Sequence, residues 1–348
     1  MEISMEDFHK VLLERVLDLL WRQWSALGTY TSTPQYTAAV IDPEALVSAT
    51  AWFARYSPRL FDEAIDWLGA NDSIISIDRL KSTARFLSSD TQAVLGAILD
   101  FMWEDLKKIK FKEKSRRWEK ERLSKKEPLF RSWPNLGEPS GSNIDRIFQR
   151  WGFKRGIVEL RGMSSAPSLQ NPANLRFVLR NLFGLGVRAE VATYLVTVGQ
   201  GNSSQVAKAI IQNQRAVYAI LEDLARGEFA QKRETGREIV FAANKERWAS
   251  FLQLDGAAHF IRWADLFSAL QDILVDRIEN ERAYESPYLA SSRLREISPR
   301  IIKRLANIGV VSTIPDSRRF PGEDYGPAFF EYVYQIMDAL LPADNDSL

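Results

Sequence analysis

A chain of 348 residues with 45% hydrophobic and 26% charged residues has the composition of a globular protein with two or three domains. The absence of cysteine excludes disulfides and thiolate chemistry, and two histidines far apart in sequence, His9 and His259, do not predict a metal site. A net charge of +1 means that any contact with nucleic acid must come from a local basic patch. Because cysteine is absent and the two histidines are far apart, we expect no bound metal, and we expect no other cofactor.

The N-terminus begins acidic and amphipathic, without the basic start and apolar run of a secretion signal. No stretch approaches the length of a membrane span. Together with the lack of cysteine, these features predict a soluble cytoplasmic protein that makes no contact with a membrane.

Residues 1–105 predict an N-terminal helical domain. In its first helix Leu12, Val16 and Leu19 recur with the period of an amphipathic helix. Residues 29–37, rich in Ser, Thr and Pro, predict a loop. Further helices are expected to begin where residues suit an N-cap or a first helical turn, namely at Asp42–Pro43, Pro58, Ser76 and Asp90.

Three acids on one of these helices, Asp62, Glu63 and Asp66, could be read as paired catalytic carboxylates. Acids near a helix start are more often surface groups that suit the helix dipole, and we expect that role here. No Ser-His-Asp arrangement and no phosphate-cradling glycine motif is recognisable. The sequence therefore favours a protein that is not an enzyme. The alternative, an undetected site in the N-terminal domain, would need a polar pocket lined by clustered Asp, Glu and Arg.

Residues 106–170 predict a basic connector followed by a linker. Lys and Arg interleave with Glu over 104–132, which is typical of a solvated, salt-bridged helix or a mobile connector. Trp118 has only charged neighbours, so we expect it to dock on another domain or on a partner. Residues 133–143 have the Pro, Gly, Ser and Asn content of a linker, and 156–163 predict a short strand.

Residues 171–252 predict a separate domain built from short elements in a fixed order. A helix over 188–197 ends at a Gly-Gln-Gly-Asn segment. Ser203 or Ser204 is expected to cap a second short helix, in which the small Ala207 allows a close helix crossing.

A tight turn over 211–213 leads into a third helix, whose buried stripe includes Val217 and Leu224. Gly227 suits the C-terminus of that helix. Two short strands joined by a turn at 234–236 then predict a hairpin, because polar and apolar residues alternate in the second strand.

Residues 253–348 predict a C-terminal helical region. A wide apolar and aromatic face over 258–281 is either part of the core of the chain or the interface of a homodimer, and the sequence favours neither. Pro299 is expected to begin a further helix, and apolar residues from Phe329 to Leu340 form the stripe of the last one.

The order and spacing of S-S-x-V-A-K-A-I, Q-N-Q-R-A-V-Y-A-I-L-E-D-L, G-x-F and the hairpin resembles the winged helix-turn-helix superfamily of bacterial regulators over residues 187–243. The flanking segments resemble no family. Together the elements predict a mainly α protein, with an N-terminal helical module, a central winged helix-turn-helix with a short β-hairpin wing, and a C-terminal helical region.

The resemblance implies a recognition helix that lies in the major groove of double-stranded DNA. The side chains that would read base edges are those at the exposed N-terminal end of the third helix and one further along, namely Gln212, Asn213, Gln214, Arg215 and Tyr218. Phosphate contacts near the second helix would come from Ser203, Ser204 and Lys208. Wing contacts to the minor groove or backbone would come from Lys232, Arg233 and Arg237.

Two functions stay open on this sequence, because the motif carries nearly as much acid as base. The first is a non-catalytic DNA-binding protein, a bacterial transcriptional regulator that uses the winged helix. The second is a protein-interaction scaffold, or an antitoxin or defence-system component, whose winged helix docks a protein partner.

Overall fold

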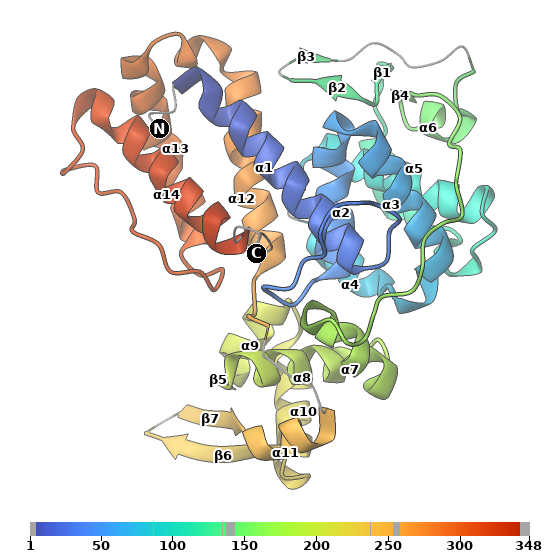
Figure 1. The fold of residues 1–348 in the computed structure, drawn as a ribbon, viewed down its shortest axis with the longest axis vertical. Coiled ribbons are helices and arrows are strands. Elements are labelled where there is room, and N and C mark those ends of the chain that lie inside the picture. The colour runs from blue at the N-terminus through green and yellow to red at the C-terminus, as the bar shows by residue number, and fades with distance from the viewer. Residues whose placement is uncertain are drawn as a thin grey trace.

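The computed structural model describes residues 5–85, 87–133, 135–136, 143–236, 238–252 and 258–341. It confirms the prediction of a mainly helical protein with small sheets. Within these residues no helix combines the length and the apolar character needed to cross a membrane. Figure 1 shows α1 and α12–α14 side by side, α2–α5 next to them, and α7–α11 with β5–β7 projecting from both.

The α-helices are α1 (Met5–Ala26), α2 (Pro43–Phe53), α3 (Pro58–Asn71), α4 (Ile77–Ala84), α5 (Ser89–Glu104), α6 (Arg146–Arg150), α7 (Leu175–Phe183), α8 (Val187–Val198), α9 (Ser203–Ile210), α10 (Gln214–Arg226), α11 (Lys245–Leu252), α12 (Trp263–Glu279), α13 (Pro287–Leu305) and α14 (Tyr325–Leu340). The strands are β1 (Glu127–Pro128), β2 (Arg131–Ser132), β3 (Asn135–Leu136), β4 (Phe153–Lys154), β5 (Gln200–Asn202), β6 (Ala230–Thr235) and β7 (Glu238–Ala243). The 3₁₀ helices used below are η4 (Lys114–Glu121) and η6 (Glu281–Tyr284).

Local sequence signals place the first helices correctly. The Asp42 side chain accepts a hydrogen bond from the backbone N–H of Ala45 at 3.2 Å and so caps α2, with Pro43 in the first turn. Pro58 begins α3, and Ser76 caps α4 through the N–H of Arg79. The predicted helix starts in this region are therefore confirmed to within one residue.

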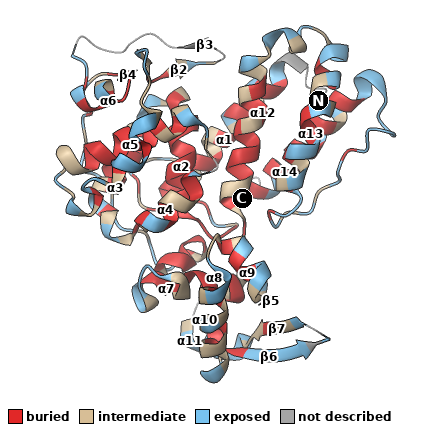
Figure 2. Cartoon of the chain, turned by 180° about the vertical axis from the view of Figure 1, so that it is seen from behind, coloured by how far each residue is buried: buried red, intermediate tan, exposed pale blue. Residues whose placement is uncertain are grey.

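One core joins the two ends of the chain. The apolar stripe of α1 is buried against helices from the C-terminal region, and Phe8 stacks on Phe330 of α14 with ring centroids 3.6 Å apart. Helix α12 packs on α1 and α2, which buries Trp263 and Leu270. In Figure 2 the inner face of α12 is red, the colour of buried residues. Of the two alternatives for the apolar face over 258–281, the structure therefore shows the core of the chain, and a homodimer would have to use another surface.

The charged connector is exposed along one side and packs on the large part of the chain along the other. Its residues form η4, which packs against α5. Trp118 is 2% exposed and belongs to the same core, so it anchors this segment inside the chain rather than on a partner. The surrounding Lys and Arg side chains point outward, which explains why composition alone indicated a solvated stretch.

The three acids of α3 are not free surface groups, and residues 156–163 are not a strand. Glu63 and Asp66 are buried, and all three acids bind the irregular segment that runs past them. Because side-chain bonds hold the segment, it needs no sheet partner. The partners are Arg155 for Asp62, Arg161 for Glu63, and the backbone N–H groups of Gly162 and Ser164 for Asp66.

Pro299 does not begin a helix but lies inside α13. That helix begins at Pro287 behind the N-cap Ser286. Proline removes the N–H that would bind the carbonyl four residues earlier, here that of Arg295. The Ser298 hydroxyl donates to this carbonyl at 3.3 Å and replaces the missing partner, which lets the helix continue.

The projecting part of the chain, residues 171–252, has a second core of its own and is called the small unit below. Helices α8, α9 and α10 pack on one another, and β5, β7 and β6 form an antiparallel sheet in that order. In the hairpin Lys232 pairs with Phe241 and Thr235 with Glu238. The edge strand β6 is largely exposed, whereas the central strand β7 is mostly half-buried (Figure 2).

A buried group of six charges joins the small unit to the rest of the chain. Every member is at most 4% exposed. We call it the six-charge cluster, and its members are Asp42, Glu44, Arg79, Arg176, Arg180 and Glu190.

Arg180 of α7 is the central link in the six-charge cluster. It donates two hydrogen bonds to Glu44 of α2, each 2.8 Å, and one of 2.8 Å to Glu190 of α8. Arg79 of α4 pairs with Asp42 and also donates to the carbonyl of Ile210, the last residue of α9, at 2.6 Å. Three cations and three anions therefore balance across four helices and the N-cap of α2.

The ion pairs of Glu190 change its pKa more strongly than burial does. Burial alone would raise this pKa, but Arg176, Arg79 and Arg180 together lower it to about 2. The pKa of Asp42 is lowered against the same opposing effect of burial, mainly by Arg79. Both carboxylates therefore stay ionised at neutral pH.

We predict that Glu190→Gln, which keeps the shape of the side chain but removes its charge, destabilises the fold by about 3–5 kcal/mol, because it leaves a buried cation unpaired. Urea unfolding followed by circular dichroism measures this loss. Asp223→Asn is the matched control, since it removes a half-buried carboxylate of α10 that pairs with Arg188 and Arg226 outside the cluster. Equal losses in the two variants would show that the six-charge cluster does not hold the units together.

His9 on α1 is buried among aromatic rings. Its ring lies edge-on to Tyr284 of η6, with centroids 5.0 Å apart, and neither ring nitrogen has a hydrogen-bond partner among the described residues. Burial, with a smaller effect of Arg277, lowers the pKa of His9 to about 3. The folded chain therefore holds this imidazole neutral at pH values where the unfolded chain protonates it.

The pKa of His9 is lower in the folded chain than in the unfolded chain. The free energy of unfolding is therefore unaffected by His9 above about pH 6.5 and decreases as the pH drops below that value. We predict a loss of about 2 kcal/mol between pH 6.5 and pH 5 that disappears in His9→Leu. Urea unfolding at each pH measures the slope. The control His259→Leu, which changes an exposed histidine, should keep the slope of the natural chain, and a slope unchanged in His9→Leu would refute the prediction.

Candidate nucleic-acid interface

Helices α9 and α10 are set by two asparagine caps and one left-handed residue. Asn202, not Ser203 or Ser204, caps α9 in a capping box, in which Asn202 and Gln205 each accept from the other's backbone N–H. Ile211 takes a left-handed conformation with φ of 57° and ends α9. The turn predicted over 211–213 is therefore confirmed, and it joins two helices that pack on each other.

The side chains at the start of α10 divide into two groups. Asn213 caps the helix, because its side chain accepts from the backbone N–H of Arg215 at 2.9 Å and of Ala216 at 3.3 Å. Its side-chain oxygen is thus occupied by the cap, so only the amide NH₂ group remains for the predicted base contact. Gln214 and Arg215 are exposed, and no ion pair holds Arg215 among the described residues.

The second predicted group lies on α9. Ser204 and Lys208 are exposed, whereas Ser203 is half-buried and its hydroxyl accepts a hydrogen bond from Gln214 at 3.1 Å. This bond ties the first turn of α9 to the first turn of α10. Gln212, in the turn between them, is half-buried, so its side chain is less accessible than the sequence suggested.

The hairpin places its basic residues on opposite faces. Lys232 points toward α10 and binds Glu222 with 2.7 Å between the ammonium nitrogen and the carboxylate oxygen. Because side chains alternate along a strand, the next residue, Arg233, lies on the other face, where it bonds to Gln231 at 2.9 Å. The wing cations therefore do not form one surface, and Arg237 lies outside the described residues.

Tyr218 and Lys232 meet at Glu222 on α10. Hydrogen bonds from Lys232 and Tyr218 hold the pKa of Glu222 below its usual range, and the same carboxylate raises the pKa of Tyr218. Acid on α10 thus neutralises one of the predicted contact residues. The next residue, Asp223, binds both Arg188 and Arg226.

A separate polar hollow of about 420 Å³ lies on the large part of the chain. It is lined by the α3 acids and by the segment that they hold, namely Arg59, Asp62, Glu63, Asp66, Glu159, Leu160 and Arg161. Most of its carboxylate oxygens already accept hydrogen bonds from that segment, which is a structural role. Among the described residues no group of His, Cys, Asp and Glu is arranged to hold a metal ion.

Sequence reasoning missed the six-charge cluster. One signal for it exists on α7, where Arg176 and Arg180 lie four residues apart and therefore share a helix face, between the buried Phe177 and Leu179. The acids that complete it lie up to 136 positions away, as in the pair of Arg180 with Glu44. No local pattern predicts a contact over that distance.

Comparisons with known proteins place the chain in no family. No family model, no curated protein and no solved structure matched it. The functional argument therefore rests on the geometry of α9, α10 and the hairpin.

We predict that Asn213→Ala destabilises the small unit by about 0.5–2 kcal/mol, because α10 loses its N-cap, whereas Asn213→Asp keeps the cap and most of the stability. Thermal unfolding of both variants measures the difference. If alanine leaves stability unchanged, the side chain of Asn213 is free, and its assignment as a cap fails.

Proposed function

We propose that α8, α9, α10 and the β5–β7–β6 sheet constitute a winged helix-turn-helix, and that the protein is a non-catalytic double-stranded DNA-binding protein of the bacterial transcriptional regulator kind. The element order supports the proposal: two helices joined by a tight turn, then a two-stranded wing on a three-stranded sheet. In this arrangement α10 is the recognition helix.

The observation that carries the proposal is the exposed first turn of α10. Gln214 and Arg215 are exposed there, just beyond the α9–α10 turn, whose preceding residue Ile210 binds Arg79 of the large part. An α-helix is about 10–12 Å wide and the major groove is about 12 Å wide, so such an end can enter the groove. Arg binds guanine and Gln binds adenine through paired hydrogen bonds.

Backbone contacts in this proposal come from α9 and the wing. Ser204 and Lys208 would approach the phosphates beside the recognition helix. To contact DNA, Lys232 would have to give up its ion pair with Glu222 and form one with a phosphate group instead. Arg233, on the far face of the hairpin, is a weaker candidate contact than the sequence implied.

One observation favours a second function, docking of a protein partner. Glu222 and Asp223 on α10 bind Lys232, Arg188 and Arg226, so much of the positive charge of the small unit is already paired. DNA binding draws most of its affinity from cations that neutralise phosphates. A scaffold, antitoxin or defence-system component would instead use α10 against a protein surface.

The test measures binding to a mixed-sequence duplex over a range of salt concentrations by fluorescence anisotropy. Each phosphate neutralised contributes about 0.9 to the slope of log affinity against log salt. We predict that the double variant Lys208→Ala with Arg215→Ala lowers this slope by about two and weakens binding at least tenfold near 50 mM salt.

The matched control is Lys120→Ala with Lys126→Ala, which removes the same charge from exposed positions on the large part of the chain. It should leave both slope and affinity nearly unchanged. Equal effects of the two double variants would mean that DNA contacts no particular face. Lack of binding by the natural chain at low salt would favour the protein-docking function.

A further inference from the structure

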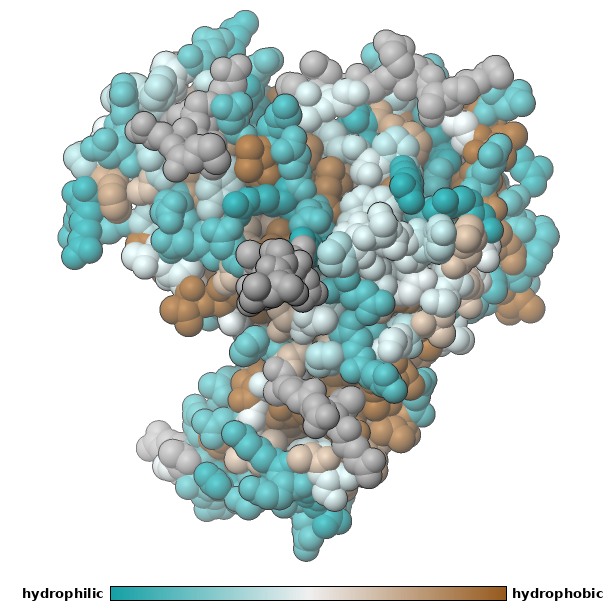
Figure 3. Space-filling model, viewed as in Figure 1, coloured by the Kyte–Doolittle hydropathy of each residue, from teal (hydrophilic) through white to brown (hydrophobic). Residues whose placement is uncertain are grey.

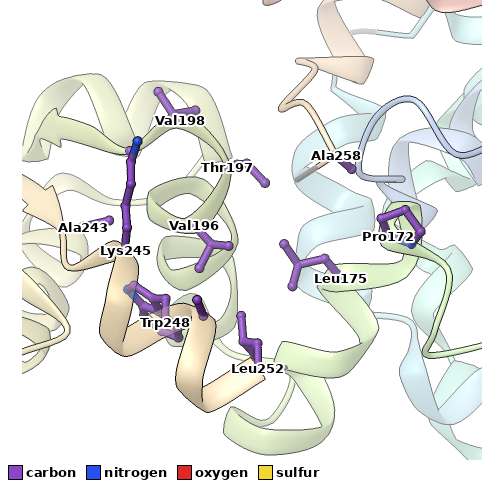
Figure 4. A pocket seen from close by; sticks show the side chains of 12 residues that line it. Pro172, Leu175, Val196, Thr197, Val198, Ala243, Lys245, Trp248, Leu252 and Ala258 are labelled. Atoms are coloured by element: carbon purple, nitrogen blue, oxygen red, sulfur yellow. The ribbon is translucent and has the colours of Figure 1, made fainter. Parts of the chain in front are cut away.

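The small unit contains a pocket of about 380 Å³ between α7, α8 and α11 (Figure 4). Leu175 and Pro172 face Trp248 and Leu252 across it, and Val196 and Thr197 of α8 lie between them. Pockets that bind small molecules measure about 300–1,000 Å³, so the volume suits a small ligand. The lining residues are Pro172, Leu175, Val196, Thr197, Val198, Gly199, Ala243, Lys245, Trp248, Ala249, Leu252 and Ala258.

The walls of the pocket are apolar. Trp248 contributes an indole that is 3% exposed, and Leu175, Val196 and Leu252 add aliphatic surface. Apolar side chains are also exposed at the end of α7 beside it, where Leu182 is 52% exposed. On the face shown in Figure 3, brown apolar residues gather on the small unit, whereas much of the upper part is teal. Burying a hydrocarbon against such walls is favourable, by about 0.8 kcal/mol for each CH₂ group.

The rim of the pocket is cationic. Lys245, the first residue of α11, reaches up beside Val198 (Figure 4) and forms no ion pair within the described residues. The pocket adjoins a polar hollow of about 430 Å³, because Val198, Gly199, Ala243 and Lys245 line both. The hollow also presents Arg233 and one carboxylate, that of Glu246. Two cations against one anion favour a ligand group of negative charge.

We propose that this pocket binds a small carboxylic acid with an apolar body, whose hydrocarbon part lies against Trp248, Val196 and Leu252 and whose carboxylate binds Lys245. The apolar walls select the body, and the ammonium at the rim selects the acid over a neutral or cationic analogue. Binding of a ligand in this pocket does not depend on DNA binding, so either proposal can fail without the other.

The test uses the full chain with decanoate as the probe, below the concentration at which it forms micelles, and with decanol as its neutral counterpart, below its solubility limit. Isothermal titration should show one decanoate bound per chain. Lys245→Ala should weaken decanoate binding about two- to fivefold, as expected for a single exposed ion pair, and leave decanol binding unchanged. The control is Arg247→Ala, because Arg247 lies on the same helix but its guanidinium pairs with Glu228. This variant should bind decanoate and decanol as the natural chain does.

The second part of the test fills the pocket with a larger side chain. Ala249 is exposed and lines the pocket, so Ala249→Trp can occupy the space without disturbing the core, and it should abolish binding of both probes. Ser250→Trp is the control, because the neighbouring residue is exposed but does not line the pocket. The proposal is overturned if the natural chain binds no decanoate, if Ala249→Trp still binds it, or if Lys245→Ala affects both probes equally.

Discussion

The fold depends on the six-charge cluster at the junction of its two cores. An isolated ion taken out of water costs several kcal/mol, so six charges that are each at most 4% exposed persist only if their partners satisfy them. Arg180 meets that requirement with three hydrogen bonds to Glu44 and Glu190, each 2.8 Å. Such a cluster adds little net stability compared with apolar packing, but separating its members would leave charges buried and unpaired, which opposes any other arrangement of the elements that share it.

This constraint has a consequence for the surface that the small unit presents. Arg79, a member of the cluster, also binds the carbonyl of Ile210 at the end of α9, one residue before the turn into α10. The bond satisfies a carbonyl at the negative end of a helix dipole. The large helical part thus holds the α9–α10 turn directly and leaves the first turn of α10, with Gln214 and Arg215, directed outward. A preorganised helix end of this kind loses little conformational freedom when it binds a groove.

Features encoded within a few residues could be predicted from the sequence, and features encoded between distant residues could not. The caps at Asp42 and Ser76, the stripe of α1, and the turn at Ile211 each follow from neighbouring residues, and the structure contains them. The charged neighbours of Trp118 predict that it docks on another domain or on a partner but do not say which, and its contacts lie in the core of the large part. The opposite directions of Lys232 and Arg233 were implied by strand alternation. The pairing of Lys232 with Glu222, however, depends on how the hairpin packs on α10.

The central claim is that the large helical part holds the small unit so that α9, α10 and the wing face outward and bind DNA. Hydrogen–deuterium exchange of the full chain, with and without a mixed-sequence duplex at low salt, tests it most directly. The account predicts that the duplex slows exchange in the first turns of α9 and α10 and in the hairpin, and leaves α1–α5 and α12–α14 unchanged. Slowed exchange confined to the large part, or no change anywhere while the duplex is bound, would contradict it.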